Sequence, residues 1–106
     1  MKRVYIAGPM TGVPEFNYPA FNALAAELRT EGFHVENPAE NPEPVGKTWA
    51  GYMRMSIAQM LTCDFVVVLD GWDQSRGARI EVELAVDLGM TVIRAGSNEA
   101  IELHAV

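Results

Sequence analysis

Two glutamates stand close together in the segment GWDQSRGARIEVELAVDLG, residues 71–89, and their types and spacing could support chemistry. On a helix, where successive residues are about 100° apart, Glu83 falls on a polar strip between Arg79 and Asp87. Glu81 falls instead among leucine and alanine positions, on the apolar side. A carboxylate there must be paired, hydrogen-bonded or beside a cavity, because burying it without partners is costly.

The same periodicity predicts which side chains of this segment face the core. Two interpretations of Glu81 remain open: a structural residue at the positive end of the helix dipole, or a pocket residue whose environment tunes its pKa for catalysis. The residues expected on the apolar face are Ile80, Leu84, Ala85 and Leu88, with Val82 and Val86 at its far edge.

Composition narrows the class of protein. A chain of 106 residues forms one domain, and its apolar share of 49% is ordinary for a globular protein. A net charge of −6 without a basic run argues against binding a nucleic-acid polymer, although a small phosphorylated ligand stays compatible. The single cysteine, Cys63, excludes a disulfide framework, and the short apolar run near the N-terminus is no signal or membrane segment. We therefore expect a cytoplasmic protein without membrane contact.

Apolar runs and helical patterns alternate along the chain, which predicts an α/β fold. We expect a flavodoxin-like (Rossmann-like) three-layer sandwich with a four- to five-stranded parallel sheet. The expected strands are Arg3–Ala7, Phe33–Glu36, Asp64–Leu69 and Met90–Arg94. The expected helices run from an Asn17 cap to Gly32, then Trp49–Thr62, Arg76–Leu88 and a short Gly96–His104, with a long proline-rich loop at Pro38–Lys47.

In such folds ligands bind beyond the carboxyl ends of the strands, and two loops there carry suitable residues. The first, AGPMTG, has Gly8 and Gly12, which allow close backbone approach, although a plain turn explains them equally well. The second, DQSRGA, places Ser75 at a helix start, where it either binds an anion or only caps the helix. Trp72 either stacks on a base or sugar or covers the sheet edge.

Other chemistries fit the sequence poorly. Asp70 ends a strand, which is where the phosphoacceptor aspartate of a receiver domain lies. A receiver domain also needs an acidic pair after the first strand and a lysine further along. This chain has no such pair and no lysine after Lys47, so we reject that interpretation. Asp64 and Asp70 begin and end one strand, too far apart for a shared metal site. The histidines are isolated, so no Ser-His-Asp hydrolase is predicted.

Several spaced motifs resemble one family along nearly the whole chain. They are YIAGPMTG, NPAE, W..YMR leading to CDFVVVLDGW, and S.GA..E...A...G. The chain resembles a small-domain family of unknown function, frequent in phages and bacteria, that looks like a compact branch of the nucleoside 2-deoxyribosyltransferase superfamily. That superfamily includes the deoxynucleoside 5′-monophosphate N-glycosidases.

The resemblance implies a glutamate nucleophile that attacks C1′ of the sugar, and the matching position is Glu81. Tyr5 matches a sugar- or base-side contact, and Ser75 and Gly77 match the region that holds a 5′-phosphate. No cofactor and no metal are expected. The residues expected to bind substrate are Gly8, Pro9, Met10, Gly12, Asn37, Asp70, Trp72, Ser75 and Gly77.

The chain departs from the superfamily at one position. Relatives carry an aspartate in the helix before the third strand, as in YMRRDI, whereas this chain has Ser56 in YMRMSI. A hydroxyl cannot accept a proton as a carboxylate does, so slow chemistry, another substrate or binding without turnover all stay open. The leading expectation is an N-glycosidase or transferase acting on a nucleoside or nucleotide. The alternative is a nucleotide-binding protein without turnover, and either is expected to be a homodimer or larger.

Overall fold

The apolar runs form the strands of one parallel sheet. The computed structural model describes residues 2–97. The strand order is β2-β1-β3-β4, and all three neighbouring pairs are parallel. The strands are β1 (Arg3–Ala7), β2 (His34–Glu36), β3 (Phe65–Val68) and β4 (Thr91–Arg94).

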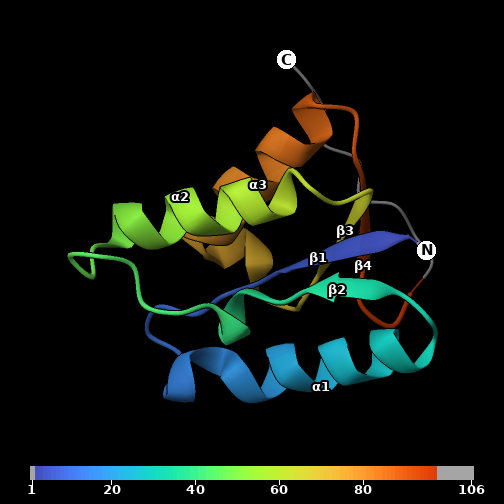
Figure 1. Cartoon of the computed structure of the whole chain (residues 1–106), viewed down its shortest axis with the longest axis horizontal. Helices are drawn as coiled ribbons and strands as arrows, with labels where there is room; N and C mark the ends of the chain where they lie inside the picture. Colours follow the sequence, from blue (N-terminus) through green and yellow to red (C-terminus); the bar gives the residue numbers. More distant parts are fainter. Residues whose placement is uncertain (1, 98–106) are drawn as a thin grey trace.

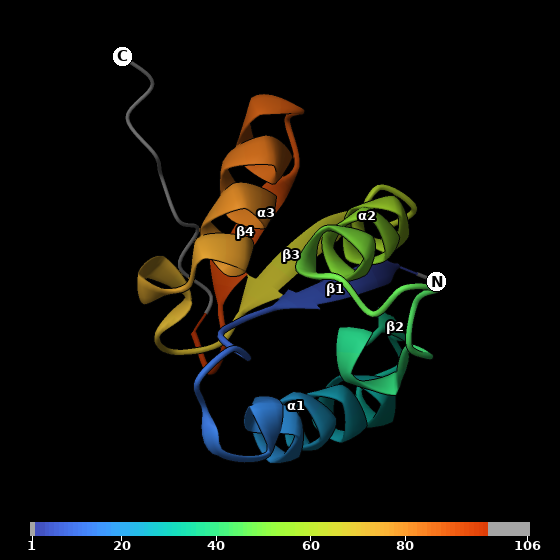
Figure 2. The same cartoon turned by 90° about the vertical axis from the view of Figure 1, so that its left-hand side faces the viewer.

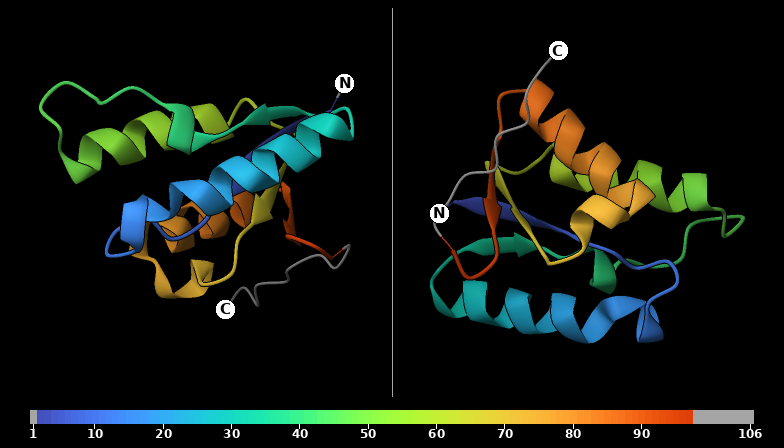
Figure 3. Two further views of the ribbon diagram at one scale, coloured as in Figure 1. Left: turned by 90° about the horizontal axis from the view of Figure 1, so that it is seen from below. Right: turned by 180° about the vertical axis from the view of Figure 1, so that it is seen from behind.

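Within the described residues, three α-helices cover the two faces of this sheet. Helix α1 (Tyr18–Thr30) lies on one face, while α2 (Trp49–Met60) and α3 (Arg76–Asp87) lie side by side on the other (Figures 1 and 2). Figure 3 shows α1 alone on its side of the sheet. The expected flavodoxin-like three-layer α/β fold is confirmed, with four strands.

The side chains of the central strand β1 alternate between two cores, one on each face of the sheet. Successive side chains of a strand point to opposite faces, so Val4 and Ile6 pack with α1. Tyr5 and Ala7 point the other way and join the core beneath α2 and α3. The helices bury one side each, as Leu24 of α1 does. Both layers therefore depend on β1, whose last four residues are almost fully buried.

Most element boundaries agree with the sequence within one or two residues, and two expectations need comment. Asn17 does occupy the N-cap position of α1, but with a left-handed φ of 62° its side chain makes no capping hydrogen bond. The expected final helix, Gly96–His104, falls almost entirely outside the described residues. Short 3-10 helices, which were not anticipated, occupy η1 (Pro14–Asn17), η2 (Pro38–Glu40) and η3 (Trp72–Gln74).

The buried side of α3 differs from the expected apolar face. Its buried residues are Ala78, Glu81, Val82 and Ala85. Glu81 therefore does point inward, but the exposed fractions are 38% for Ile80 and 57% for Leu88. The small side chains of Ala78 and Ala85 on the inner side allow α3 to approach the sheet closely. Ile80 and Leu88 stay outside, but Leu84 is half-buried and packs against the core.

The strand order reverses at β1, and the expected binding crevice lies at the carboxyl ends of β1 and β3. After β1 the chain moves to one side to form β2, and it returns to the other side of β1 for β3. The carboxyl ends of β1 and β3 are neighbours, because Ala7 is paired with Val68. Loops that leave these two ends diverge, which is the usual origin of a binding site in open parallel sheets. None of the helices in residues 2–97 has the length and apolar character needed to cross a bilayer.

Candidate active site

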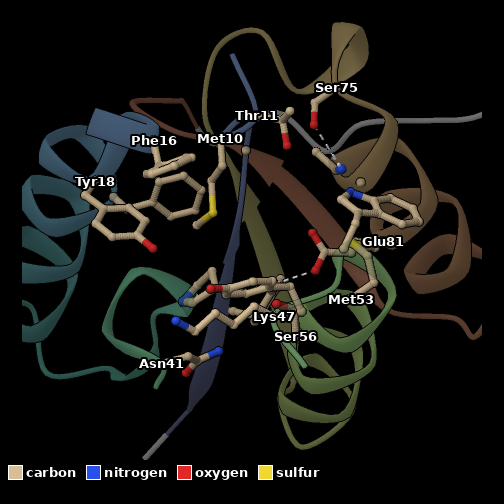
Figure 4. A pocket seen from close by; sticks show the side chains of 18 residues that line it. Met10, Thr11, Phe16, Tyr18, Asn41, Lys47, Met53, Ser56, Ser75 and Glu81 are labelled. Carbon is tan, nitrogen blue, oxygen red and sulfur yellow. Dashed lines mark hydrogen bonds between the residues drawn. The ribbon is translucent and has the colours of Figure 1, made fainter. Parts of the chain in front are cut away.

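A pocket of about 370 Å³ opens at the carboxyl ends of β1 and β3 (Figure 4). Its floor includes Tyr5 from β1, Ser56 from α2 and Glu81 from α3. Aromatic side chains from η1 and the start of α1 form one wall, and the first turns of α2 form the other. Three separate elements thus bring polar groups to one apolar-walled cavity.

Glu81 is the buried acid of this pocket. Its exposed fraction is 5%, and that of Tyr5 is 1%. The Tyr5 hydroxyl donates a hydrogen bond to Glu81 Oε2 at 2.5 Å. Among the described residues, every fully buried side-chain oxygen or nitrogen has a hydrogen-bond partner. Tyr5 is a partner for Oε2 of Glu81 alone. The other oxygen, Oε1, is therefore open to the cavity, where Figure 4 shows the carboxyl group.

The environment raises the pKa of the Glu81 carboxyl from 4.5 to about 7. Burial is the main cause, because the ionised form loses its hydration, and the hydrogen bond from Tyr5 acts in the opposite direction. The pKa of Tyr5 is raised well above 10, first by burial and then by the nearby Glu81 charge. Tyr5 therefore stays a neutral donor, while Glu81 changes its charge near neutral pH.

Ser56 takes part in the same polar group. Its hydroxyl lies close enough to Tyr5 to lower the pKa of that phenol, against the larger effects of burial and Glu81. The α2 segment places Ser56 on the side that faces the pocket, as the helical periodicity predicted. A chain of neighbours therefore runs from Ser56 through Tyr5 to Glu81.

Local structure explains why α3 presents Glu81 at this point. Ser75 is the N-cap of α3, and its Oγ accepts a hydrogen bond from the Ala78 amide at 3.3 Å. Ser75 therefore caps the helix, and it also lines the pocket. In a helix that begins at Arg76, the amides of Arg76 and Gly77 have no partner within the helix.

Gly8 and Gly77, which line the pocket, also allow neighbouring elements to pack closely. A Cβ on Gly8 would lie 2.9 Å from Leu69 Cβ, so the loop after β1 could not approach β3 as closely with a larger residue. A Cβ on Gly77 would lie 3.0 Å from Met53 Sδ, at the contact between α3 and α2. Both glycines thus bring the pocket walls together as well as lining them.

Comparison with known families identifies the chain. Residues 2–94 match a family model described as a domain of unknown function, DUF4406. The chain belongs to this family. No curated protein matches the sequence.

In this DUF4406 domain, seven of the residues expected at the site do line the pocket. The other five do not: Asn37 is buried and binds Asn22 and the Ala39 amide, Asp70 is exposed, and Trp72 packs against the core beneath α2 and α3. Pro9 and Gly12 belong to the loop after β1 but are not part of the lining. The seven lining residues are Tyr5, Gly8, Met10, Ser56, Ser75, Gly77 and Glu81.

Most residues of the aromatic walls were not predicted from the sequence. Phe16 and Tyr18 reach one wall because residues 15–17 adopt left-handed backbone angles, which their residue types do not predict. Their ring centroids are 6.0 Å apart. Trp49 and Tyr52 form part of the other wall, and the Arg76 guanidinium stacks 4.1 Å from the Trp49 ring centroid. The motif W..YMR was the available signal for the second wall.

The long loop before α2 adds two polar residues that were also missed. Asn41 lines the pocket and donates a hydrogen bond to Gln59 at 2.8 Å, which holds its amide in place. Lys47 lines the pocket too, with a left-handed φ of 50° and an ion pair to Glu43 at 3.3 Å. No group of three or more His, Cys, Asp or Glu suited to a metal ion occurs within residues 2–97.

Proposed function

We propose that this domain cleaves or transfers the N-glycosidic bond of a nucleoside or nucleoside 5′-monophosphate, with Glu81 as the nucleophile. The observation that carries this proposal is the placement of Glu81: a buried carboxyl with one oxygen open to the pocket and a pKa of about 7. Perturbed carboxyls in pockets are frequently catalytic, because burial and specific partners match their ionisation to the working pH.

The reaction follows from the two oxygens of Glu81. In the ionised form, Oε1 attacks C1′, the bond from C1′ to the base nitrogen breaks, and its electron pair leaves with the base, which takes a proton from water. Tyr5 keeps its hydrogen bond to Oε2 and orients the carboxylate. Water then attacks C1′ of the glycosyl ester, the bond from C1′ to Oε1 breaks, and the proton that this water loses neutralises the hydroxide left by the first step. A second base that attacks in place of water gives a transfer product.

The walls suit such a substrate. Aromatic rings on both sides offer stacking surfaces for a base, and the cavity volume is in the range of sites for small ligands. Two places in the pocket suit a phosphate group: Lys47 on one side and the N-terminal amides of α3, next to Ser75, on the other (Figure 4). The resemblance of the motifs to nucleoside 2-deoxyribosyltransferases and deoxynucleoside 5′-monophosphate N-glycosidases adds support, since the position matched to their nucleophile is Glu81.

A second candidate is a nucleotide-binding protein without turnover. Ser56, in place of the aspartate of the superfamily, favours it, since a hydroxyl cannot take up the proton that a carboxylate accepts. A protonated Glu81 would then donate a hydrogen bond to the bound ligand. Both candidates use the same pocket, but only the enzyme needs Glu81 for turnover.

The decisive experiment measures free base released from a panel of nucleosides and 5′-monophosphates by chromatography. The proposal expects release by the wild type and none by Glu81→Gln or Glu81→Ala. Glu83→Gln is the matched control, because Glu83 is exposed on the same helix, and it should keep full activity. Absence of release with every substrate, together with ligand binding that survives Glu81→Gln, would support the binding protein instead.

A second measurement tests the covalent step itself. Acid quenching during turnover should trap a glycosyl adduct on the wild type, visible as added mass on the peptide that contains Glu81. The Glu81→Gln protein should carry no such mass. Base release without an adduct at any quench time would replace the nucleophilic mechanism by direct attack of water.

A further inference from the structure

The Glu81 carboxyl is a buried negative charge when it is ionised, and the fold gives it a neutral partner. Within residues 2–97 it accepts a hydrogen bond from the Tyr5 hydroxyl and forms no ion pair. Burying an ionised carboxylate is costly unless an opposite charge offsets its lost hydration. The raised pKa of Glu81 reflects this cost, because burial is its main cause. A ligand that carries a positive charge into the pocket would supply the opposite charge.

The aromatic walls of the pocket also suit a positive charge. In Figure 4, Phe16 and Tyr18 lie across the cavity from the Glu81 carboxyl, and their ring centroids are 6.0 Å apart. The face of an aromatic ring is negative and attracts cations, most strongly where water is displaced. Trp49 on the other wall already interacts in this way, because the Arg76 guanidinium lies 4.1 Å from its ring centroid. Aromatic rings together with a carboxylate are suited to an organic cation.

The lysine of the pocket does not offset the charge of Glu81. The Lys47 side chain is 74% exposed, and its Nζ forms an ion pair with Glu43 at 3.3 Å. The causes of the Glu81 pKa shift are burial and the Tyr5 hydrogen bond. Lys47 is suited instead to an anionic part of the same ligand, such as a 5′-phosphate.

A positively charged base also simplifies the departure of the leaving group. When the bond from C1′ to a neutral base breaks, the electron pair makes the base an anion, which needs a proton. When the base already carries a fixed positive charge, the same electron pair makes it a neutral molecule, and no proton is needed. Oε1 of Glu81 is engaged as the nucleophile at this moment, and Ser56 offers a hydroxyl where the resembling enzymes have a carboxyl. A charged base therefore fits the groups that line this pocket.

We propose that the substrate is a nucleoside or nucleoside 5′-monophosphate whose base ring carries a fixed positive charge, as in a pyridinium or an N7-alkylated purine. This inference rests on the proposed function and names its substrate class. The rings of Phe16 and Tyr18 hold the charged base, and Glu81 attacks C1′ from the opposite side. The base leaves as a neutral molecule. Water then attacks C1′, the bond from C1′ to Oε1 breaks, and the proton that this water loses passes to the solvent.

The first test compares 7-methylguanosine 5′-monophosphate with guanosine 5′-monophosphate, which differ by one methyl group and one charge. Ribose and 2-deoxyribose forms of both are used, and nicotinamide mononucleotide adds a smaller pyridinium base. Each kcat/KM is divided by the uncatalysed rate constant, because charged bases also leave more easily without an enzyme. We expect this ratio to be about tenfold or more higher for the charged bases.

The possible outcomes separate this inference from the proposed function. An equal or higher ratio for guanosine 5′-monophosphate, with release abolished in Glu81→Gln, would overturn the inference and leave the proposed function intact. Release of base from none of these nucleotides would overturn both.

Substitution of Phe16 tests whether the wall recognises the charge. Phe16→Leu removes the ring but keeps an apolar side chain, so KM should rise about threefold to tenfold for the methylated nucleotide and less for the unmethylated one. Phe16→Tyr restores a ring and should restore the preference for the charged base. Val45→Ala is the surface control, because Val45 is fully exposed and does not line the pocket. Circular dichroism verifies that each variant is folded, and equal losses for both nucleotides in Phe16→Leu would overturn the inference.

Discussion

The Tyr5 hydroxyl lies 2.5 Å from Glu81 Oε2, and this hydrogen bond joins the central strand to α3 across 76 residues of sequence. Both side chains are almost completely buried. The pair gives one carboxylate oxygen a fixed donor and leaves the other oxygen to face the pocket. The following predictions concern this pair and the residues around it.

Replacing Glu81 by Gln should stabilise the protein at alkaline pH. The folded-state pKa of Glu81 is raised from 4.5 to about 7, so between these values the folded chain holds a proton that the unfolded chain has lost. Stability therefore falls as pH rises from 4.5 to 7, by about 3 kcal/mol for a shift of this size. We expect Glu81→Gln to be more stable than the wild type by about that amount at pH 8. Denaturant unfolding at several pH values measures the difference.

The advantage of Glu81→Gln should vanish as pH falls well below 4.5, where the wild-type carboxyl is protonated in both the folded and the unfolded state. Glu83→Gln, an exposed control on the same helix, should show no such pH-dependent gain. Equal stability of Glu81→Gln and the wild type at pH 8 would contradict the burial of an ionisable acid at this position.

Replacing Tyr5 by Phe should move the ionisation of Glu81 to higher pH. The Tyr5 hydrogen bond lowers the pKa of Glu81, so its loss raises that pKa beyond about 7. Because the nucleophile must be ionised, kcat/KM should rise with pH through a midpoint near 7 in the wild type and through a higher midpoint in Tyr5→Phe. A pH–rate profile with an unchanged midpoint would show that Tyr5 does not set this ionisation.

Replacing Ser56 by Asp should increase turnover. The change supplies the carboxylate that the resembling enzymes have at this point, and acid-base assistance is expected to accelerate the reaction about tenfold or more. The added negative charge should also raise the pKa of Glu81, which shifts the pH profile upward. Ser56→Asn is the control, since it has the same shape without the charge. If both variants release base at equal rates, the added carboxylate has no chemical role.

Replacing Lys47 by Ala should discriminate between phosphorylated and unphosphorylated ligands. Lys47 is the cation that lines the pocket, but its side chain is largely exposed, so its effect is modest. We expect Kd for a 5′-monophosphate to rise about threefold to fivefold, while Kd for the matching nucleoside stays the same. Calorimetry at low and moderate salt measures both. Lys2→Ala, an exposed lysine that does not line the pocket, is the control, and equal losses for both ligands would exclude a phosphate contact.

Much of the architecture could be predicted from the sequence, because it depends on local patterns. Alternating apolar runs and helical periodicities indicated the parallel sheet and its two helical layers. The inward direction of Glu81 and the cap at Ser75 also depend on spacing within one segment, and both are confirmed. Local periodicity determines which residues share a side of a helix.

Periodicity does not determine which side of the helix the rest of the protein covers. The expected apolar face of α3 placed Ile80 and Leu88 toward the core, yet both are exposed. The sheet and α2 meet α3 along its small residues instead, because these permit closer contact. The direction of burial was thus decided by the positions of the neighbouring elements.

The sequence by itself determined the fold class, the edge of the sheet where the pocket lies and the acid within it. Only the tertiary structure joined Tyr5 to Glu81, since their partnership needs the register of β1 against the helices. It also brought Phe16 and Lys47 to the pocket through left-handed backbone angles in their loops. The physical reason is that contacts between distant segments and the conformations of irregular loops result from the packing of the whole chain.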